Sequence, residues 1–128
     1  MKMSILLAGI LCLTLVILSG AAFSELESIT IKVSPSTIIV GADVEWVTVH
    51  TTVPLARVDC STLTLNGISV AWTKADAKGN LVAKFHYNEI EGIVVPPRAI
   101  LTLKGIAKDG VPFSGSDSVL VRKVEPRR

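Results

Sequence analysis

Histidine and aromatic residues are scarce in this 128-residue chain, and their scarcity limits the chemistry that it can perform. The two histidines, His50 and His86, are too few for a zinc site, which needs three or four ligands. Aromatic side chains make up 5% of the chain, so a core must be built mainly from aliphatic residues. The 13 basic and 11 acidic residues nearly balance, which argues against the clustered positive charge of a nucleic-acid groove.

Cysteine is scarce as well, and this limits covalent cross-links. Cys12 lies in an uncharged apolar segment near the amino end, so removal of that segment would leave Cys60 alone. No disulfide could then form within the remaining chain. We expect Cys60 to be a small buried residue at a strand edge, because free cysteine is among the most buried residue types. A thiol that joins two chains is the alternative, and a nucleophile is disfavoured because nothing in the sequence pairs Cys60 with a histidine.

The amino-terminal 22 residues have the composition of an export signal. A positive charge at Lys2 precedes an apolar core at 4–18, and small residues follow at 19–22. This order is typical of a secretory signal peptide, with cleavage before Ala22 or before Phe23. No lipidation cysteine is evident in the segment. The chain therefore divides into an export segment and one domain of ordinary size.

An uncleaved membrane anchor is the alternative interpretation of the same segment. Residues 3–22 would form a helix of about 30 Å, which is long enough to cross the hydrocarbon core of a bilayer. The predicted boundaries are therefore a signal peptide or anchor at 1–22 and a domain at 23–128. Either interpretation places the domain outside the cytoplasm, where it is secreted, at the cell surface or membrane-anchored.

The domain sequence alternates apolar and polar residues at period two, which indicates half-buried β-strands. In 27–33, for example, Ile29, Ile31 and Val33 share one face. The run at 44–53 is rich in valine and threonine, whose β-branched side chains favour strands over helices. One helical turn is expected at 88–94. Strands are expected at 27–33, 37–40, 44–53, 61–65, 68–73, 81–87, 100–107 and 118–124.

Turn residues between these runs favour an all-β architecture. Asn66-Gly67 is the strongest short hairpin signal, because both residues tolerate positive φ. Seven or eight short strands in roughly 100 residues predict a two-sheet antiparallel sandwich with immunoglobulin-like topology, preceded by an N-terminal hydrophobic helix. An open barrel is the alternative. We expect aliphatic residues, together with Trp46, Trp72 and Phe85, to form the core.

The second half of the chain carries a family resemblance. Residues 61–124 include TLTLNGISVAW, then GNLVAKF, and then ILTLKGIAKDGVPFSGSDSVLV. They resemble the immunoglobulin-like modules that recur in secreted and cell-surface proteins of bacteria and archaea. The resemblance implies a structural or adhesive role, without catalysis or a cofactor. Some of these modules have an acidic, calcium-binding type of loop, from which the loop at 75–80 departs because Asp76 is its only carboxylate. The matching residues are Leu103, Gly105, Asp109, Gly110, Pro112, Phe113, Gly115 and Asp117.

The segment DGVPFSGSD, where the resemblance is strongest, also has a physical interpretation. Asp109-Gly110 predicts a tight turn, and Pro112 cannot donate a hydrogen bond to a β-ladder. We expect Phe113 to fold back as a plug over the open end of the sandwich, buried between the sheets. We expect Gly115 to allow a bulge and Asp117 to accept backbone N–H groups.

The remaining polar residues do not predict a catalytic, cofactor-binding or metal-binding site. We expect His50 and His86 to face solvent from strands. The paired acids would need a long cleft to act as a glycosidase, which this chain is too short to build, so we expect them to be solvated. These acids are Asp43, Glu45, Glu89 and Glu91. The tail at 122–128 carries four basic residues, which are expected to be solvated or to contact anionic lipid or wall polymer.

Three functional hypotheses follow. The leading one is a non-enzymatic exported immunoglobulin-like domain with a structural or adhesive role at the cell surface. Its partner would be a cell-surface protein or polysaccharide and not a nucleic acid. A carbohydrate-binding accessory domain would require two of Trp46, Trp72 and Tyr87 side by side on an exposed face. A membrane-anchored subunit of a surface assembly would require that the amino-terminal helix is retained, and only then would the protein contact a membrane.

Overall fold

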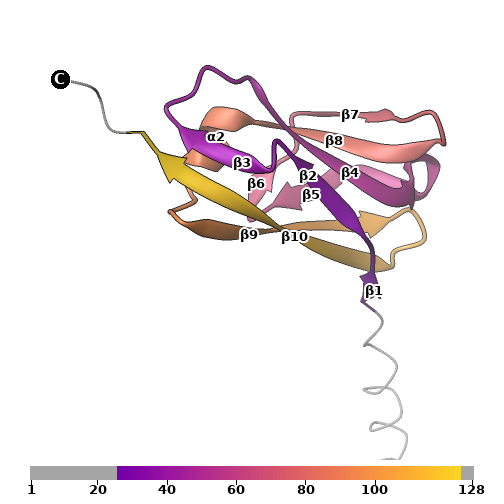
Figure 1. Ribbon diagram of the computed structural model, residues 1–128. Coiled ribbons are helices and arrows are strands. Elements are labelled where there is room, and N and C mark those ends of the chain that lie inside the picture. Colours follow the sequence, from indigo (N-terminus) through magenta and orange to yellow (C-terminus); the bar gives the residue numbers. More distant parts are fainter. Residues whose placement is uncertain (1–25, 125–128) are drawn as a thin grey trace, which may run out of the picture.

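A computed structural model describes residues 26–124, which form a two-layer sandwich of β-sheets (Figure 1). The all-β sandwich predicted from the sequence is confirmed. The predicted signal segment or hydrophobic helix at 1–22 lies outside the described residues, as do Arg127 and Arg128 of the basic tail. Helical structure in the described range consists of the 3-10 turn η1 (Leu55–Arg57) and the short helix α2 (Tyr87–Glu91). No helix within residues 26–124 has the length and apolarity to span a membrane.

The strands divide into a four-stranded sheet and a six-stranded sheet. The four-stranded sheet is antiparallel and has the order β2 (Ile31–Ser34), β4 (Trp46–Pro54), β8 (Asn80–His86) and β7 (Trp72–Ala75). The six-stranded sheet has the order β1 (Glu27–Ser28), β10 (Pro112–Lys123), β9 (Arg98–Ala107), β5 (Val58–Leu65) and β6 (Ile68–Ser69), with β3 (Thr37–Val40) also paired with β10. Contrary to the prediction, pairing is not antiparallel throughout, because β1 and β3 run parallel to β10.

The described chain has ten strands rather than seven or eight, because two predicted strands are shared between the sheets. The run predicted at 27–33 contributes β1 to the six-stranded sheet and β2 to the four-stranded sheet. The run predicted at 68–73 divides into β6 and β7 in the same way. The division is visible in adjacent backbone groups, since Val70 N–H donates to Leu63 of β5 and Ala71 N–H donates to Lys84 of β8. Period-two alternation marks the buried face of a strand but does not identify its partner strand.

The core lies between the two sheets and is mainly aliphatic. Phe85 is fully buried there, as predicted, together with Tyr87 and Phe113. The prediction that Trp46 and Trp72 belong to this core is wrong. Val47 and Val49 of β4 face the core, so Trp46 points away from it, and Trp72 is 42% exposed. The core therefore consists of aliphatic residues together with Phe85, Tyr87 and Phe113.

Strand β10 differs most from the prediction. It begins at Pro112, and its regular pairing with β9 already includes Phe113 opposite Gly105. The burial of Phe113 is confirmed, but the ring is an ordinary inward-facing strand residue and not a folded-back plug. Gly115 pairs with Leu103 without the expected bulge. The turn at Asp109-Gly110 is confirmed by the hydrogen bond from Gly110 N–H to Ala107 O (2.8 Å).

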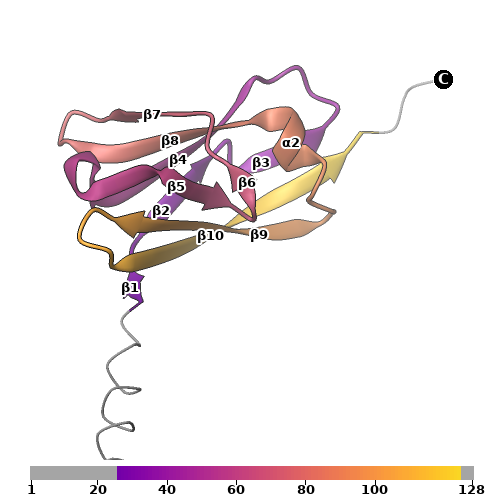
Figure 2. The ribbon, with the colours of Figure 1, turned by 180° about the vertical axis from the view of Figure 1, so that it is seen from behind.

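Side chains satisfy backbone groups at two sheet edges, as edge strands require. Asp117 of β10 reaches the other sheet, where its Oδ2 accepts a hydrogen bond from Val33 N–H of β2 (2.9 Å). Its Oδ1 accepts one from Ser118 N–H, so the predicted role of Asp117 is confirmed. Helix α2 lies beside β3, at the end of the sandwich opposite β1 (Figures 1 and 2). Tyr87 Oη accepts a hydrogen bond from Ile39 N–H (2.7 Å) and donates one to Ile39 O (3.0 Å).

Tyr87→Phe should therefore lower the free energy of unfolding by roughly 1–2 kcal/mol. The substitution keeps the buried ring but removes the hydroxyl that pairs with both backbone groups of Ile39. Equilibrium urea unfolding measures the loss. Hydrogen exchange should also become faster at the Ile39 amide, and an unchanged exchange rate there would contradict this account of the β3 edge.

Candidate binding face of the four-stranded sheet

The outer face of the four-stranded sheet gathers tryptophan, histidine and lysine side chains, and we call it the aromatic–lysine face. Its composition follows from the register, because directly opposed residues in neighbouring strands point to the same side of a sheet. Both histidines lie on this face and are exposed, as predicted. Three rows cross the face: Trp46–His86, then Ser34–Thr48–Lys84–Trp72, and then Lys32–His50–Val82–Lys74.

Three rings form a cluster at one end of this face. Trp46 of β4 and Trp72 of β7 lie on the two strands that neighbour β8, and their side chains meet above it with centroids 5.9 Å apart and planes at 85°. His86 lies against Trp46 at 4.8 Å with a much smaller interplanar angle of 31°. Edge-to-face and tilted stacking of this kind stabilises aromatic pairs. The cluster therefore holds two partly exposed tryptophan rings in defined orientations.

Lys84 lies beside the ring cluster and is held by two neighbours. Its Nζ donates a hydrogen bond to Thr48 Oγ1 (2.7 Å) and lies 5.7 Å from the ring centroid of Trp72. The second contact has the geometry of a cation–π interaction. The Lys84 side chain is half-buried, and it has no carboxylate partner among residues 26–124. The ammonium group is therefore positioned beside an exposed aromatic ring with part of its donor capacity unused.

The three rows carry no acidic side chain. Lys32, Lys74 and Lys84 give the described part of this face a uniformly positive character, and the two histidines add no negative charge. Val82 also belongs to the outer face but is only 1% exposed, because its neighbours cover it. The face is thus a packed surface of rings, hydroxyls and ammonium groups.

The third predicted aromatic, Tyr87, is not part of this surface. Its ring is buried and its hydroxyl is used at the β3 edge. The alternation of Trp46 with Val47 and Val49 could have placed Trp46 on the outer face. No such signal exists for Trp72, which alternates in step with Ile68 and Val70, and both of these pack against the core. Trp72 lies outside because the chain changes from one sheet to the other directly after Val70.

The other candidate residues do not form a reactive group. Cys60 of β5 was predicted to be buried, but it is only half-buried against the core. Its Sγ lies 3.6 Å from the Thr73 hydroxyl. Since His50 and His86 lie on an outer face, the structure does not bring them to Cys60. Asp76 Oδ1 accepts hydrogen bonds from the backbone N–H groups of Lys78 and Asn80, so it stabilises its own turn. No group of three or more metal-ligating side chains occurs in the described range.

The paired acids are solvated, with one exception. The exposed members are Asp43, Glu45 and Glu89. Glu91 is half-buried, and its Oε2 accepts a hydrogen bond from Gly41 N–H (2.8 Å). This contact links α2 to the end of β3. Glu91 thus has a structural role that the sequence did not indicate.

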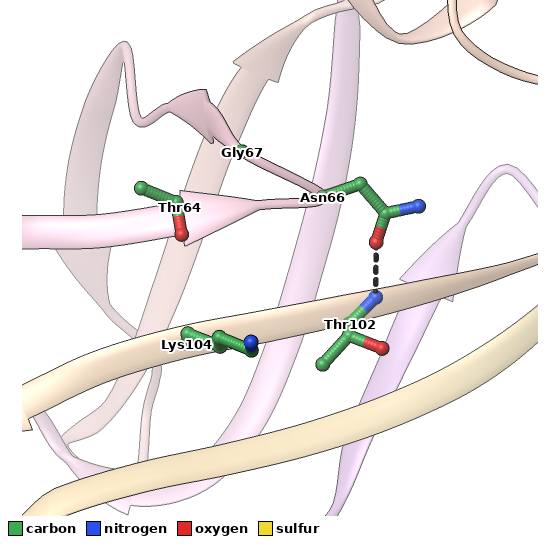
Figure 3. Close-up of a pocket in the computed structure, with 5 residues that line it drawn as sticks. All are labelled: Thr64, Asn66, Gly67, Thr102 and Lys104. Atoms are coloured by element: carbon green, nitrogen blue, oxygen red, sulfur yellow. Dashed lines mark hydrogen bonds between the residues drawn. The ribbon is translucent and has the colours of Figure 1, made fainter.

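A hollow of about 550 Å³ lies on the other sheet, beside the last paired residues of β5 and β9 (Figure 3). Asn66 and Thr102 line it, and both polar atoms of the Asn66 side chain form hydrogen bonds there. Its Oδ1 accepts a hydrogen bond from Thr102 N–H (2.7 Å), and its Nδ2 donates one to Ile100 O (3.0 Å). These bonds extend the pairing of β5 with β9 beyond Leu65. The hairpin predicted at Asn66-Gly67 is confirmed, with φ of 47° and 85°, and we interpret the hollow as structural.

Comparison with known proteins gives no match: no protein-family model, no curated protein and no solved structure matches this chain. The functional interpretation therefore depends on the residues and on their geometry. The feature of the described residues that most resembles a binding site is the aromatic–lysine face.

Proposed function

We propose that this protein is a non-enzymatic exported immunoglobulin-like domain that acts as an adhesive module at the cell surface. We further propose that it binds its partner through the aromatic–lysine face. The observation that carries the proposal is the pair of partly exposed tryptophans, Trp46 and Trp72, held side by side on the outside of a sheet. Large aromatics are enriched at the energetic centres of interfaces, because they bury much surface at little entropic cost.

The strand order supports the immunoglobulin-like part of the proposal. When β1, β3 and β6, which lie at the margins of the six-stranded sheet, are set aside, seven strands remain. One sheet then contains the first, second, fifth and fourth of them, and the other sheet contains the seventh, sixth and third. This is the arrangement of the constant-type immunoglobulin sandwich. The resemblance at 61–124 points in the same direction.

The composition of the first 22 residues supports export. These residues lie outside the described range, so the choice between a cleaved signal and a retained anchor remains a prediction from the sequence. A retained anchor would make the protein a membrane-anchored subunit of a surface assembly. In both cases the domain would present the aromatic–lysine face outside the cytoplasm.

Carbohydrate binding is the second candidate function, and one observation favours it. A carbohydrate-binding domain would require two of Trp46, Trp72 and Tyr87 side by side on an exposed face. Trp46 and Trp72 lie side by side on the outer face of the four-stranded sheet. A tryptophan ring packs well against the C–H face of a sugar, while nearby polar groups bind the hydroxyls. Thr48 and Lys84 supply such groups beside the rings.

The test is binding to isolated cell envelopes from the producing organism, with protein purified from cells that express the full chain. Trp72→Ala should weaken envelope binding at least tenfold, or about 1.4 kcal/mol. Ile100→Ala serves as the control, because Ile100 is 65% exposed on β9 of the other sheet. Envelope binding that is absent, or equally strong in Trp72→Ala, would overturn the proposal.

A further inference from the structure

We infer that the ligand of the aromatic–lysine face is an acidic polysaccharide, with a uronate carboxylate bound by Lys84 and the same or the adjacent sugar ring stacked on Trp72. The inference rests on the proposed function and adds the ligand class. Its basis is the combination of an exposed ring, a fixed ammonium group and a face without acids.

The charge pattern is the first step. Lys32, Lys74 and Lys84 lie in rows that contain no Asp or Glu, although the whole chain is close to neutral. The ion pair formed within the described residues, Arg57–Glu27, involves none of these lysines. A face of one charge sign on a nearly neutral protein attracts a ligand of the opposite sign.

Lys84 is the residue best placed to bind a carboxylate. An ammonium group has three donors, and the Lys84 group uses one of them on Thr48 Oγ1. The other two can form charge-assisted hydrogen bonds, which are about twice as strong as neutral ones. The Thr48 bond and the Trp72 ring also restrict the rotamer of Lys84 before the ligand arrives. Less side-chain entropy is then lost on binding.

The ring geometry favours a sugar over a flat aromatic ligand. The planes of Trp46 and Trp72 lie at 85°, so one flat group cannot stack on both rings. Trp72 is 42% exposed and lies directly opposite Lys84. A pyranose presents an apolar C–H face to one ring and carries its carboxylate at the rim, which matches a stacking ring beside a cation.

The spread of the lysines favours a polymer over a small anion. Lys32 lies on β2 and Lys74 on β7, the two edge strands of the four-stranded sheet, and both belong to the same row. Three strand spacings separate them, which is about 14 Å. Lys84 lies between them on β8, in the adjacent row. Positive charges at such intervals suit a chain with repeated carboxylates, and a single small anion would reach only one of them.

The experiment measures binding of the purified protein to polygalacturonate and to its fully methyl-esterified form, which has the same backbone without the charge. We expect polygalacturonate to bind at least tenfold more tightly. Lys84→Gln should weaken the affinity for polygalacturonate about tenfold and leave the affinity for the methyl ester unchanged. Lys84→Arg should retain most of the affinity for polygalacturonate. Trp72→Ala should weaken binding of both forms. Urea unfolding of each variant verifies that the fold is intact.

Lys104→Gln is the matched control, because Lys104 is an exposed strand lysine on the outer face of the other sheet. It should bind polygalacturonate as the unmodified protein does. Equal binding of the ester, an equal loss in Lys104→Gln, or equally tight binding of single-stranded DNA or anionic lipid vesicles would overturn the inference. If those results appear while envelope binding still requires Trp72, the proposed function survives and only the ligand class is wrong. If the unmodified protein does not bind cell envelopes at all, both the proposed function and the ligand class are wrong.

Discussion

Phe113→Ala should lower the free energy of unfolding by about 3–5 kcal/mol, a large part of the roughly 5–15 kcal/mol that stabilises a small domain. The Phe113 ring is only 1% exposed and faces the core from β10. It also covers Gly105, since a Cβ added at Gly105 would lie 2.6 Å from Phe113 Cζ. Truncation would thus leave a cavity opposite a residue that has no side chain with which to fill it.

Equilibrium urea unfolding measures this loss, and Ile100→Ala is a suitable control. Ile100 is an exposed β-branched residue on the neighbouring strand β9, so its substitution removes strand propensity without opening the core. We expect the control to cost less than about 1 kcal/mol. A loss below that level for Phe113→Ala would mean that the ring is not the core residue described here.

Gly115→Ala should destabilise the domain by about 1–3 kcal/mol through steric overlap and not through a lost contact. A Cβ at this position would lie 2.6 Å from the carbonyl oxygen of Ile29 and 2.9 Å from Cγ2 of Ile31. The oxygen belongs to the backbone between β1 and β2, so it can move only if that segment shifts. We expect faster hydrogen exchange at the Ile29 amide, which donates to Ser114 O (2.9 Å).

Gly92→Ala is a control that we expect to raise the free energy of unfolding, whereas Gly115→Ala should lower it. Gly92 has an ordinary helical φ of −72° at the end of α2, and a Cβ there would meet its nearest atoms at 3.5 Å and 3.6 Å, which is normal contact. A Gly-to-Ala change at a compatible position stabilises a protein by about 0.4–1 kcal/mol, because it restricts the unfolded chain. Similar unfolding free energies for the two variants would show that crowding at Gly115 does not matter.

Much of the architecture was predictable from local signals. The alternation in Val47 and Val49 or in Leu101 and Leu103 identified strands and their buried faces. Asn66-Gly67 and Asp109-Gly110 marked turns, because their backbone requirements are local. The burial of Phe113 and the capping role of Asp117 also agreed with expectation.

The errors arose where the outcome depends on more than one strand. Gly115 was expected to form a bulge, but its small size is needed because Ile29 approaches from another part of the chain. Phe113 was expected to fold back because Pro112 interrupts a ladder, yet proline is tolerated at the first residue of a strand, where Pro112 lies. The two tryptophans were expected in the core, but Trp46 lies on the polar side of β4, and Trp72 is exposed because the chain changes sheet directly after Val70.

The sequence by itself determined the all-β class, the turns and the export-like composition of the amino end, because periodicity, turn chemistry and hydropathy are properties of neighbouring residues. Only the tertiary structure decided that β8 lies between β4 and β7. This order brings Trp46, Trp72, Lys84 and His86 together on one face, although they come from three strands. Alternation within a strand determines which of its sides is buried, and the pairing of strands distant in sequence determines which exposed residues become neighbours.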